Sequence, residues 1–403
     1  MRVTRRDKLV CEFFAGIGLV HEALRRSGWK CIYANDFDPK KRAMYEGNYG
    51  PSSHYHECDV WDTETVLARI TERPYLATAS FPCTDMSLAG HMRGFRGKES
   101  NAFFGFMEII RRLGKEQPRL VLLENVPGFM HSHNGRDFVQ AARELADCGY
   151  WLDSFVVDAR FFVAQSRPRL FLLGYHEDIV GPPLVERRPE DSVFTDSWHQ
   201  AIQRAPSLRP RRLVETIEST TLPTGWVTIS VKEPRKVKYS LADFIDTGDS
   251  ESWWHKTEVK RHYDMMFERH KERIGAMLSR RDVTVALTAF RRVREGQQRT
   301  EVRFDGIAGC LRTPRGGSAK QIVIVIQNGE LKMRWMSPKE YGRLQGANSY
   351  KLPENVIQGL FGFGDAVCVP VIQWIDKHML TPVFEASVSR GRQRRNGRSV
   401  FSH

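Results

Sequence analysis

Short apolar runs alternate with amphipathic stretches through the first half of the chain, and this alternation constrains the fold more than any other feature. The apolar runs have the length of buried strands, and the stretches between them carry the 3.6-residue periodicity of helices. The strand-like runs are Leu9–Phe14, Cys31–Ala34, Leu76–Ser80, Leu120–Leu123, Phe155–Val157 and Leu170–Leu173, and the helical stretches are Leu19–Ser27 and Phe103–Leu113. This alternation favours an α/β fold built from βαβ units, with a mostly parallel sheet covered by helices on both faces.

The alternation stops near Gly181, and the next stretch is rich in proline and tryptophan with few clean repeats of either period. We interpret it as a separate, smaller and irregular domain. Regular patterning returns in Gln321–Gln327, Ser337–Gly346 and Val367–Met379. The predicted organisation is a first domain at 1–184, the irregular domain at 185–305, a return to the first domain at 306–385 and a tail at 386–403. Because the tail has five arginines and no acidic residue from Ser387 onward, we expect it to be disordered.

The charge and cysteine content narrow the function classes. The chain has 61 Lys+Arg against 48 Asp+Glu, a formal charge of +13, which suggests a polyanionic partner without identifying it. No uninterrupted apolar run reaches the ~18–20 residues of a bilayer span, so we expect no membrane. The seven cysteines are scattered singly, without Cys-x-x-Cys, which indicates neither a disulfide framework nor a metal site.

A glycine-containing turn after the first strand suggests a nucleoside site. Phe14-Ala-Gly-Ile-Gly18 opens the first helix, where free N–H groups and missing side chains allow a ligand to approach. A third glycine, expected for a dinucleotide fingerprint, is absent near His21. Asp36 ends the second strand, where a carboxylate can accept ribose hydroxyls. Asp59 is placed either to meet an adenine amino group or to cap a helix or turn.

Reactive side chains follow later strands at the same edge of the predicted sheet. Cys83 directly follows the fourth strand, and although a lone cysteine is usually a buried hydrophobe, this edge is where open α/β sheets build their sites. The glycine-rich, basic segment after it is typical of a gating loop. Glu124 and Asn125 end the fifth strand. Arg167 and Arg169 stand at alternate positions, so both can point the same way, either into a site or into solvent as a basic edge.

Taken together, these motifs resemble the DNA (cytosine-5) methyltransferase family of bacterial or phage type. Six motifs occur in the family's order over about residues 8–175 and 306–380: Phe14-Ala-Gly-Ile-Gly18, Pro82-Cys83, Glu124-Asn125-Val126, Gln165-x-Arg167-x-Arg169, Arg343-Leu-Gln-Gly346 and Gly364-Asp-Ala-Val367. The resemblance implies a Rossmann-like S-adenosylmethionine-dependent methyltransferase fold, with a mixed, mostly parallel sheet and helices on both faces. It also implies methyl transfer from S-adenosyl-L-methionine to C5 of a flipped-out cytosine through a covalent bond between Cys83 and C6.

The resemblance also implies roles for individual residues. Cys83 would be the nucleophile, Glu124 would hold or donate a proton at N3, Asn125 would orient that carboxyl group, and Arg167 and Arg169 would contact the cytosine carbonyl and flanking phosphates. The implied cofactor-binding residues are Phe14, Gly16, Gly18, Asp36, Phe37, Asp59, Val60, Asp365 and Val367. The implied DNA-binding residues are Ser87, Arg93 and Arg96 in the loop after the cysteine, Arg291 and Arg292 in an arginine-rich run, and Arg312 and Arg315 beyond it.

Two positions depart from the family pattern. Thr84 replaces the glutamine that commonly follows the catalytic cysteine, and we expect altered loop contacts there rather than lost chemistry. Asp365 replaces the asparagine of Gly-Asn-x-Val. If that amide normally donates a hydrogen bond, the carboxylate needs a rearranged partner.

Two other functions compete with a sequence-specific DNA methyltransferase. One is RNA (tRNA) cytosine-5 methylation, which the long 185–305 segment disfavours because duplex sites need a dedicated reader of groove edges. The other is a non-catalytic DNA-binding protein, which the intact Cys83, Glu124 and Arg167 disfavour. The expected partners are double-stranded DNA and a restriction endonuclease acting at the same site. We expect a monomer in the cytoplasm of a prokaryotic cell or a phage-infected host.

Overall fold

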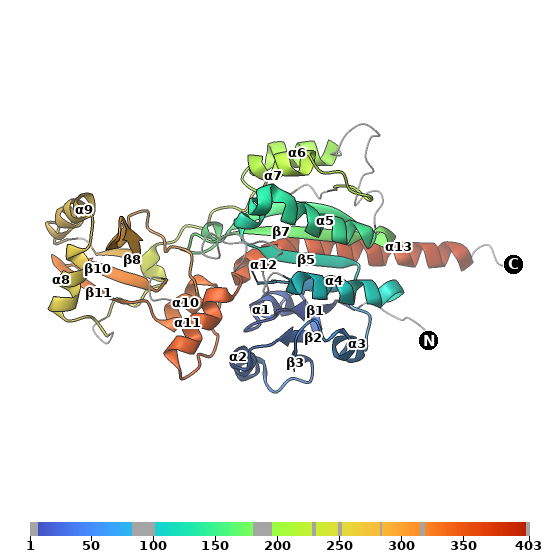
Figure 1. The fold of residues 1–403 in the computed structure, drawn as a ribbon, viewed down its shortest axis with the longest axis horizontal. Helices are drawn as coiled ribbons and strands as arrows, with labels where there is room; N and C mark the ends of the chain where they lie inside the picture. Colours follow the sequence, from blue (N-terminus) through green and yellow to red (C-terminus); the bar gives the residue numbers. More distant parts are fainter. Residues whose placement is uncertain are drawn as a thin grey trace.

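The computed structural model describes residues 7–82, 101–179, 196–227, 231–248, 252–282, 284–314 and 319–399. Its larger part is built on a seven-stranded sheet of order β3-β2-β1-β4-β5-β7-β6 (Figure 1). All adjacent pairs are parallel except those made by β7, which runs antiparallel to both β5 and β6. The strands are β1 (Leu9–Phe13), β2 (Lys30–Asp36), β3 (Tyr55–Glu57), β4 (Leu76–Ala79), β5 (Leu120–Asn125), β6 (Tyr150–Asp158) and β7 (Pro168–His176).

Helices cover both faces of this sheet, as the alternating pattern predicted. One face packs against α1 (Leu19–Arg25), α2 (Pro39–Tyr49) and α12 (Val369–Ile375). The other packs against α3 (Thr63–Arg69), α4 (Ala102–Leu113) and α5 (Arg136–Asp147). The first four residues of β5 are buried, which is the signature of a strand covered on both sides. The α/β fold class is therefore confirmed.

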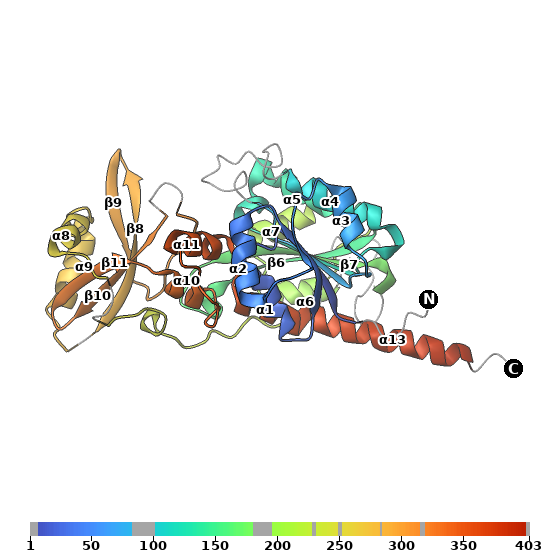
Figure 2. The ribbon, with the colours of Figure 1, turned by 90° about the horizontal axis from the view of Figure 1, so that it is seen from below.

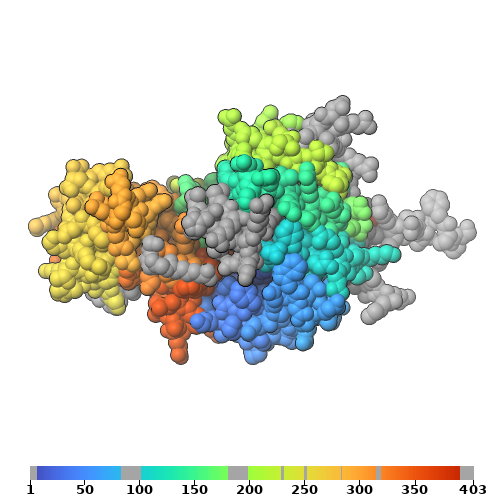
Figure 3. All heavy atoms as spheres, viewed as in Figure 1, coloured from blue at the N-terminus to red at the C-terminus, as the bar shows by residue number. Residues whose placement is uncertain are grey.

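A second, four-stranded antiparallel sheet forms a separate lobe (Figures 1 and 3). Its order is β11-β10-β8-β9, and α8 and α9 pack on one of its faces. The elements are α8 (Lys256–Asp264), α9 (Glu268–Leu278), β8 (Val285–Arg294), β9 (Gln297–Arg303), β10 (Gln321–Gln327) and β11 (Glu330–Trp335). Strand β10 serves two cores: Ile322, Ile324 and Ile326 point into the lobe, whereas Val323 and Val325 join the main core. This alternation attaches the lobe to the large domain.

The lobe differs from the predicted 185–305 domain at both ends. Helices α6 (Asp196–Arg204) and α7 (Arg211–Glu218) pack on the large sheet, where Trp198 and Ile217 enter its core. At the other end, β10 and β11 lie in the lobe although they fall within the predicted return segment 306–385. Antiparallel pairing of β10 with β8 joins segments on both sides of the predicted boundary. Composition along the chain does not reveal such a pairing.

The remaining helices connect the lobe to the large domain and end the chain. They are α10 (Pro338–Leu344), α11 (Val356–Asp365) and, after α12 and the π-helical turn Asp376–Leu380, α13 (Thr381–Ser399). At the start of α10, Ser337 and Glu340 form the capping box expected from the sequence.

The predicted disorder of 386–403 is wrong for the described part of that segment. Helix α13 runs through Ser399 and extends away from the large domain (Figure 2). Its first turns are anchored: Phe384 packs edge-on against Tyr75 with ring centroids 4.8 Å apart, and the hydroxyls of Ser387 and Tyr75 lie 2.6 Å apart. A charge pattern predicts solvation but does not exclude a helix that grows from a packed start.

One stretch of the described chain, Val356–Arg390, is long and apolar enough by composition to cross a bilayer. More than half of its most apolar window, 56%, is buried inside the protein, and Ala366–Cys368 interrupt the helix. Buried core helices meet the same test, so this is weak evidence for a membrane span.

Candidate active site

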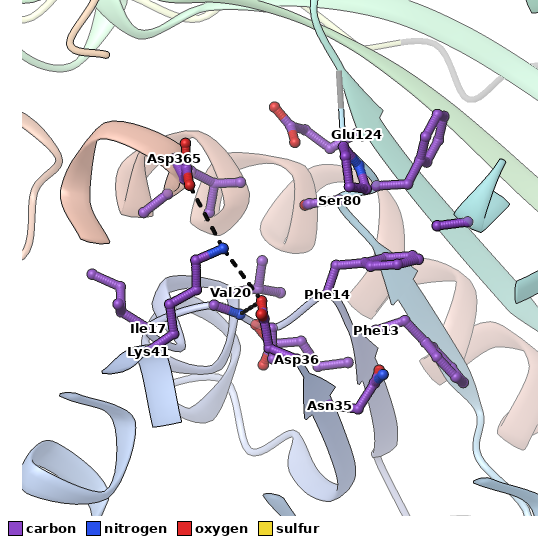
Figure 4. Close-up of a pocket in the computed structure, with 18 of the residues that line it drawn as sticks. Phe13, Phe14, Ile17, Val20, Asn35, Asp36, Lys41, Ser80, Glu124 and Asp365 are labelled. Atoms are coloured by element: carbon purple, nitrogen blue, oxygen red, sulfur yellow. Dashed lines mark hydrogen bonds and ion pairs between the residues drawn. The ribbon is translucent and has the colours of Figure 1, made fainter. Parts of the chain in front are cut away.

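The carboxyl ends of β1 to β5 surround a cavity of about 370 Å³, a size in the range of small-molecule sites (Figure 4). The end of α11 and the residues after it close the opposite wall. Eleven of the residues predicted from the sequence line this one cavity: Phe14, Gly16, Asp36, Phe37, Asp59, Val60, Glu124, Asn125, Arg169, Asp365 and Val367. The expectation that these motifs meet at one edge of the sheet is confirmed.

The turn after β1 shapes the floor of the cavity. Phe14, Gly16 and Gly18 all have positive φ, at 56°, 56° and 79°. Gly16 lines the cavity, and its backbone N–H donates to Asp36 Oδ2 at 3.1 Å. Gly18, predicted to contact a cofactor, is not among the lining residues: a Cβ there would stand 2.5 Å from the Tyr45 ring. Its glycine is required for close packing against α2 rather than for a ligand.

Asp36 is held as an acceptor at the end of β2. Its side chain is 5% exposed. Oδ1 accepts a hydrogen bond from the backbone N–H of Asp38 at 3.1 Å. Oδ2 accepts one from the backbone N–H of Gly16 and another from Lys41 Nζ at 3.5 Å. The exposed ring of Phe37 follows at the cavity mouth. Asp59 Oδ1 accepts from the backbone N–H of Trp61 at 3.0 Å, so Asp59 serves its turn as well as lining the cavity.

Glu124 and Arg169 form an ion pair in the cavity wall. Nε of Arg169 lies 2.8 Å from Oε1 of Glu124, and both side chains are largely buried, at 15% and 12% exposure. The pair forms because β7 is the antiparallel neighbour of β5. Asn125 is buried, and its Nδ2 donates to the Phe81 carbonyl at 3.4 Å. The amide thus ties the end of β5 to the segment that leads to Cys83.

Arg167 does not share this position, which corrects the prediction that it contacts substrate beside Arg169. It is 2% exposed and donates to the backbone carbonyls of Leu311 at 2.7 Å, Ala366 at 2.6 Å and Gly364 at 3.2 Å. The reason lies in the strand boundary: β7 begins at Pro168, so Arg167 precedes the strand, and its side chain does not follow strand alternation. Arg167 instead joins two backbone segments behind the cavity, one at Leu311 and one at Gly364–Ala366.

The segment Cys310–Thr313 reaches the same region from the lobe. Gly364 packs so tightly against it that a Cβ would lie 2.5 Å from the backbone N of Thr313, and Thr313 lines the cavity. Cys310 Sγ lies 3.5 Å from Arg167 Nη1. Burial alone would raise the pKa of Cys310, but Arg167, Arg169 and Arg312 together lower it. Sequence reasoning missed Cys310 because a lone cysteine carries no motif.

Comparison with known proteins decides the family. A family model described as C-5 cytosine-specific DNA methylase matches residues 9–381. The chain belongs to the C-5 cytosine-specific DNA methylase family. It is 27% identical over 388 residues to the type II methyltransferase M.HpaII of Haemophilus parainfluenzae, covering 92% of this chain and 88% of that protein. It is 24% identical to the type II methyltransferase M.HhaI of Haemophilus parahaemolyticus, covering 90% and 91%.

Solved structures of low identity share the fold. A mutant of Spodoptera frugiperda DNMT2 superposes with a TM-score of 0.57 at 16% identity, covering 92% of this chain and 99% of that one. The Entamoeba histolytica methyltransferase EhMeth gives 0.55 at 13% identity, covering 92% and 98%. As a member of its family, the C-5 cytosine methylase described here transfers a methyl group from S-adenosylmethionine to cytosine in DNA.

The cavity of this methylase fits that cofactor. It combines a carboxylate held as an acceptor at Asp36, the glycine turn with its positive φ angles and an aromatic ring at Phe37. These features suit ribose hydroxyls and an adenine ring. Lys41, which lies between Asp36 and Asp365 in the same wall, is a lining residue that sequence reasoning missed. Its only signal was a lysine in the first turns of the helix after β2.

Several predicted residues of the methylase lie outside the described ranges: Cys83, Thr84, Ser87, Arg93, Arg96 and Arg315. Pro82, the residue before Cys83, lines the cavity together with Ser80 and Phe81. Arg312 is described and is exposed beside the cavity segment.

The arginine run of the lobe divides between two faces. Arg291 and Arg292 are adjacent in β8, so they point to opposite sides of the sheet. Arg291 lies over the Trp335 ring, with its guanidinium carbon 5.0 Å from the centroid. Arg292 is exposed and stands directly opposite Arg299 of β9, on the face that also carries Val323 and Val325 toward the large domain. The two predicted DNA contacts therefore do not form one surface.

Proposed function

We propose that this methylase is a sequence-specific DNA (cytosine-5) methyltransferase that acts on a cytosine flipped out of duplex DNA, through a covalent bond from Cys83 to C6. The observation that supports it best is the Glu124–Arg169 ion pair, which faces the same cavity as Asp36 and the Pro82 segment. A carboxyl group and a guanidinium side by side match the N3 and carbonyl oxygen of a cytosine edge. Cys83, the proposed nucleophile, directly follows Pro82 in the chain.

Each catalytic group has a distinct task in this mechanism. The Cys83 thiolate forms a bond to C6, and the electrons of the C5–C6 double bond move toward C5. Glu124 holds a proton at N3, which stabilises the charge that addition places on the ring. Arg169 keeps Glu124 oriented and donates toward the carbonyl oxygen. C5 would then bond to the methyl group as the bond from that group to the cofactor sulfur breaks, which would leave S-adenosylhomocysteine. Loss of the C5 proton to a base and cleavage of the bond between the Cys83 sulfur and C6 then restore the aromatic ring, now methylated at C5, and the thiolate.

The cofactor side of the cavity is assigned to Phe14, Gly16, Asp36, Phe37, Asp59, Val60 and Val367. When bound there, S-adenosylmethionine supplies an electrophilic methyl group. Asp36 accepts from the ribose hydroxyls, because its side chain is fixed as an acceptor at the cavity, with Oδ2 on the Gly16 N–H and Oδ1 on the Asp38 N–H. Asn125 restrains the segment that leads to Cys83, through its bond to the Phe81 carbonyl.

DNA recognition is assigned to the lobe and to Arg312. Arg292 and Arg299 occupy directly opposite positions in neighbouring strands. The Arg299 guanidinium is held by Gln297 Oε1 and the Phe267 ring, so two positive charges lie on one part of the lobe, where an anion is favourable. A phosphate of the duplex provides that anion. The wider proposal includes duplex DNA as substrate, a monomeric enzyme in the cytoplasm of a prokaryotic or phage-infected cell, and a restriction endonuclease that cuts the same site.

Trapping with 5-fluorocytosine tests the mechanism, because a fluorine at C5 blocks the elimination step. Duplexes that carry the analogue should form a denaturant-resistant adduct with the wild-type protein and none with Cys83→Ala. An adduct with the alanine variant, or none with the wild type, would reject the proposal. A structured RNA with the same analogue separates DNA from RNA specificity, and bisulfite sequencing of DNA from an expressing host reads the target site.

A further inference from the structure

Lys41 stands between two carboxylates in the wall of the cofactor cavity. Its Nζ lies 3.5 Å from Asp36 Oδ2 and 3.6 Å from Asp365 Oδ2 (Figure 4). Lys41 belongs to α2, Asp36 ends β2 and Asp365 is the last residue of α11. One ammonium group therefore connects the two opposite walls of the cavity, which come from distant parts of the chain.

The surroundings hold this ammonium in place. The Lys41 side chain is 23% exposed, and its Cδ packs beside Gly16, at 4.0 Å from where a Cβ on that glycine would stand. Helices α2 and α11 are in close contact: a Cβ at Gly362 would lie 2.9 Å from Met44 and from Ile17. Lys41 and Asp365 also line a neighbouring cavity of about 380 Å³. The ion pair therefore lines both cavities, with the Lys41 side chain largely buried and the Asp365 side chain 49% exposed.

A cation beside Asp365 is favourable at this position. Asp365 ends α11, where the helix dipole places partial negative charge, so a carboxylate there is unfavourable unless a positive group balances it. Burial by itself would lower the pKa of Lys41, but Asp36, Asp365 and Asp38 together raise it. Lys41 is therefore charged at neutral pH. The Lys41–Asp365 pair adds no net charge to the cavity. The neutral asparagine that the family pattern places at position 365 also adds none.

We propose that Lys41 and Asp365 act as a charge-balanced pair that positions Asp36 and sets the preference of the cavity between S-adenosylmethionine and its demethylated product, S-adenosylhomocysteine. The two molecules differ in one sulfonium charge, which is present only in the methyl donor. A change in the net charge of the cavity therefore alters their affinities unequally. Lys41 is a positioning residue in this proposal, which rests on the assignment of Asp36 to the cofactor.

The signs of the effect follow from the charges. Lys41→Met leaves Asp365 unbalanced, so the cavity becomes more negative and favours the sulfonium ligand over the product by roughly three- to tenfold. Asp365→Asn leaves the lysine charge in excess and shifts the ratio of dissociation constants the other way by a similar factor. The double variant restores the wild-type ratio. Lys41→Met also weakens both ligands, because Asp36 loses one of its donors.

Equilibrium binding of each ligand to the full chain, measured by titration calorimetry, tests the proposal without any turnover. Lys40→Met is the matched control, since it removes the same charge from an exposed neighbour on α2 and should leave the ratio unchanged. The proposal is overturned if the two single variants move the ratio in the same direction, if neither moves it, or if Lys40→Met moves it as much. Failure of the wild type to bind either ligand would instead reject the cofactor site itself.

Discussion

Glu124 and Arg169 meet across two neighbouring strands that run in opposite directions, with Nε of the arginine 2.8 Å from Oε1 of the glutamate. The reversal of β7 within a mostly parallel sheet brings the start of one strand to the carboxyl end of another. A carboxylate and a guanidinium therefore share one wall of the cavity, although they come from motifs well separated in the sequence.

Replacing Glu124 by glutamine should slow methyl transfer about 10²- to 10⁴-fold, because the amide cannot hold the proton that stabilises the ring. The shape of the side chain and its contact with Arg169 are largely kept, so cofactor binding should change little. Single-turnover methylation of a labelled duplex measures the rate, and titration calorimetry measures the binding. A variant that loses both in parallel would indicate a structural role for Glu124.

Arg167 should matter for folding more than for contact with substrate. Arg167→Met removes a buried donor from the carbonyls of Leu311 and Gly364 and leaves the Ala366 carbonyl with the Gln345 side-chain amide as its donor, which is expected to cost about 2–4 kcal/mol. Arg169→Met, at the partly exposed ion pair, should lower the melting temperature much less and the methylation rate much more. Thermal unfolding and single-turnover rates of the two variants compare these roles. A stable Arg167→Met protein with no adduct formation would show that Arg167 acts on substrate after all.

Buried Glu12 should make the protein less stable as the pH rises from 6.5 to 8. Burial raises the pKa of Glu12 from 4.5 to about 8, against a smaller opposing effect of the His21 backbone N–H. The folded state then retains a proton that the unfolded chain has lost, and stability falls through that window by up to about 2 kcal/mol.

His21 acts in the opposite direction at lower pH. Burial, followed by the nearby charges of His54 and Arg25, lowers its pKa to about 4. The unfolded chain therefore binds a proton first, and stability rises with pH between about 4 and 6.5. The two effects overlap below pH 6.5, so the upper window isolates Glu12. Urea unfolding at pH 6.5 and 8 should show a decline for the wild type that Glu12→Gln lacks, and an identical decline in both would assign it elsewhere.

Arg292 should contribute to DNA affinity, whereas Arg291 should not. Arg292→Ala removes a charge from the exposed face shared with Arg299, so binding should weaken for every duplex and the salt dependence should decrease by about one ion. Arg291→Ala removes the contact with Trp335 and should mainly affect the stability of the lobe. Fluorescence anisotropy at several salt concentrations distinguishes them. Equal salt slopes for the two variants would contradict the division of faces.

Removal of residues 391–403 should weaken binding to all duplexes alike and leave the methylated sequence unchanged. The segment contains four arginines and no acidic residue, so it supplies affinity without base contacts. The truncation must begin after Arg390, because Ser387 bonds to Tyr75 and a longer deletion also removes an anchor of the large domain. Bisulfite sequencing with the truncated protein checks the site, and a changed site would assign recognition to the tail.

Much of the architecture could be predicted from local patterns. Six of the seven strands of the large sheet, all but the short β3, and the capped start of α10 follow from periods and end signals that neighbouring residues carry. The lobe could not, because its sheet pairs β8 with β10 across the connection after β9, and such pairing depends on residues far apart in the chain.

The sequence by itself determined which chemical groups this protein brings to the carboxyl edge of its sheet. A glycine turn, Asp36, Glu124 and an arginine motif follow successive strands, and strand ends in such a sheet converge. Only the tertiary structure decided which of these groups face one another. Arg169 reaches the cavity and Arg167 does not, because the strand begins between them. Asp365 finds Lys41 because α2 and α11 pack together there. The direction in which a side chain points and the residue that it contacts depend on packing, which no local pattern specifies.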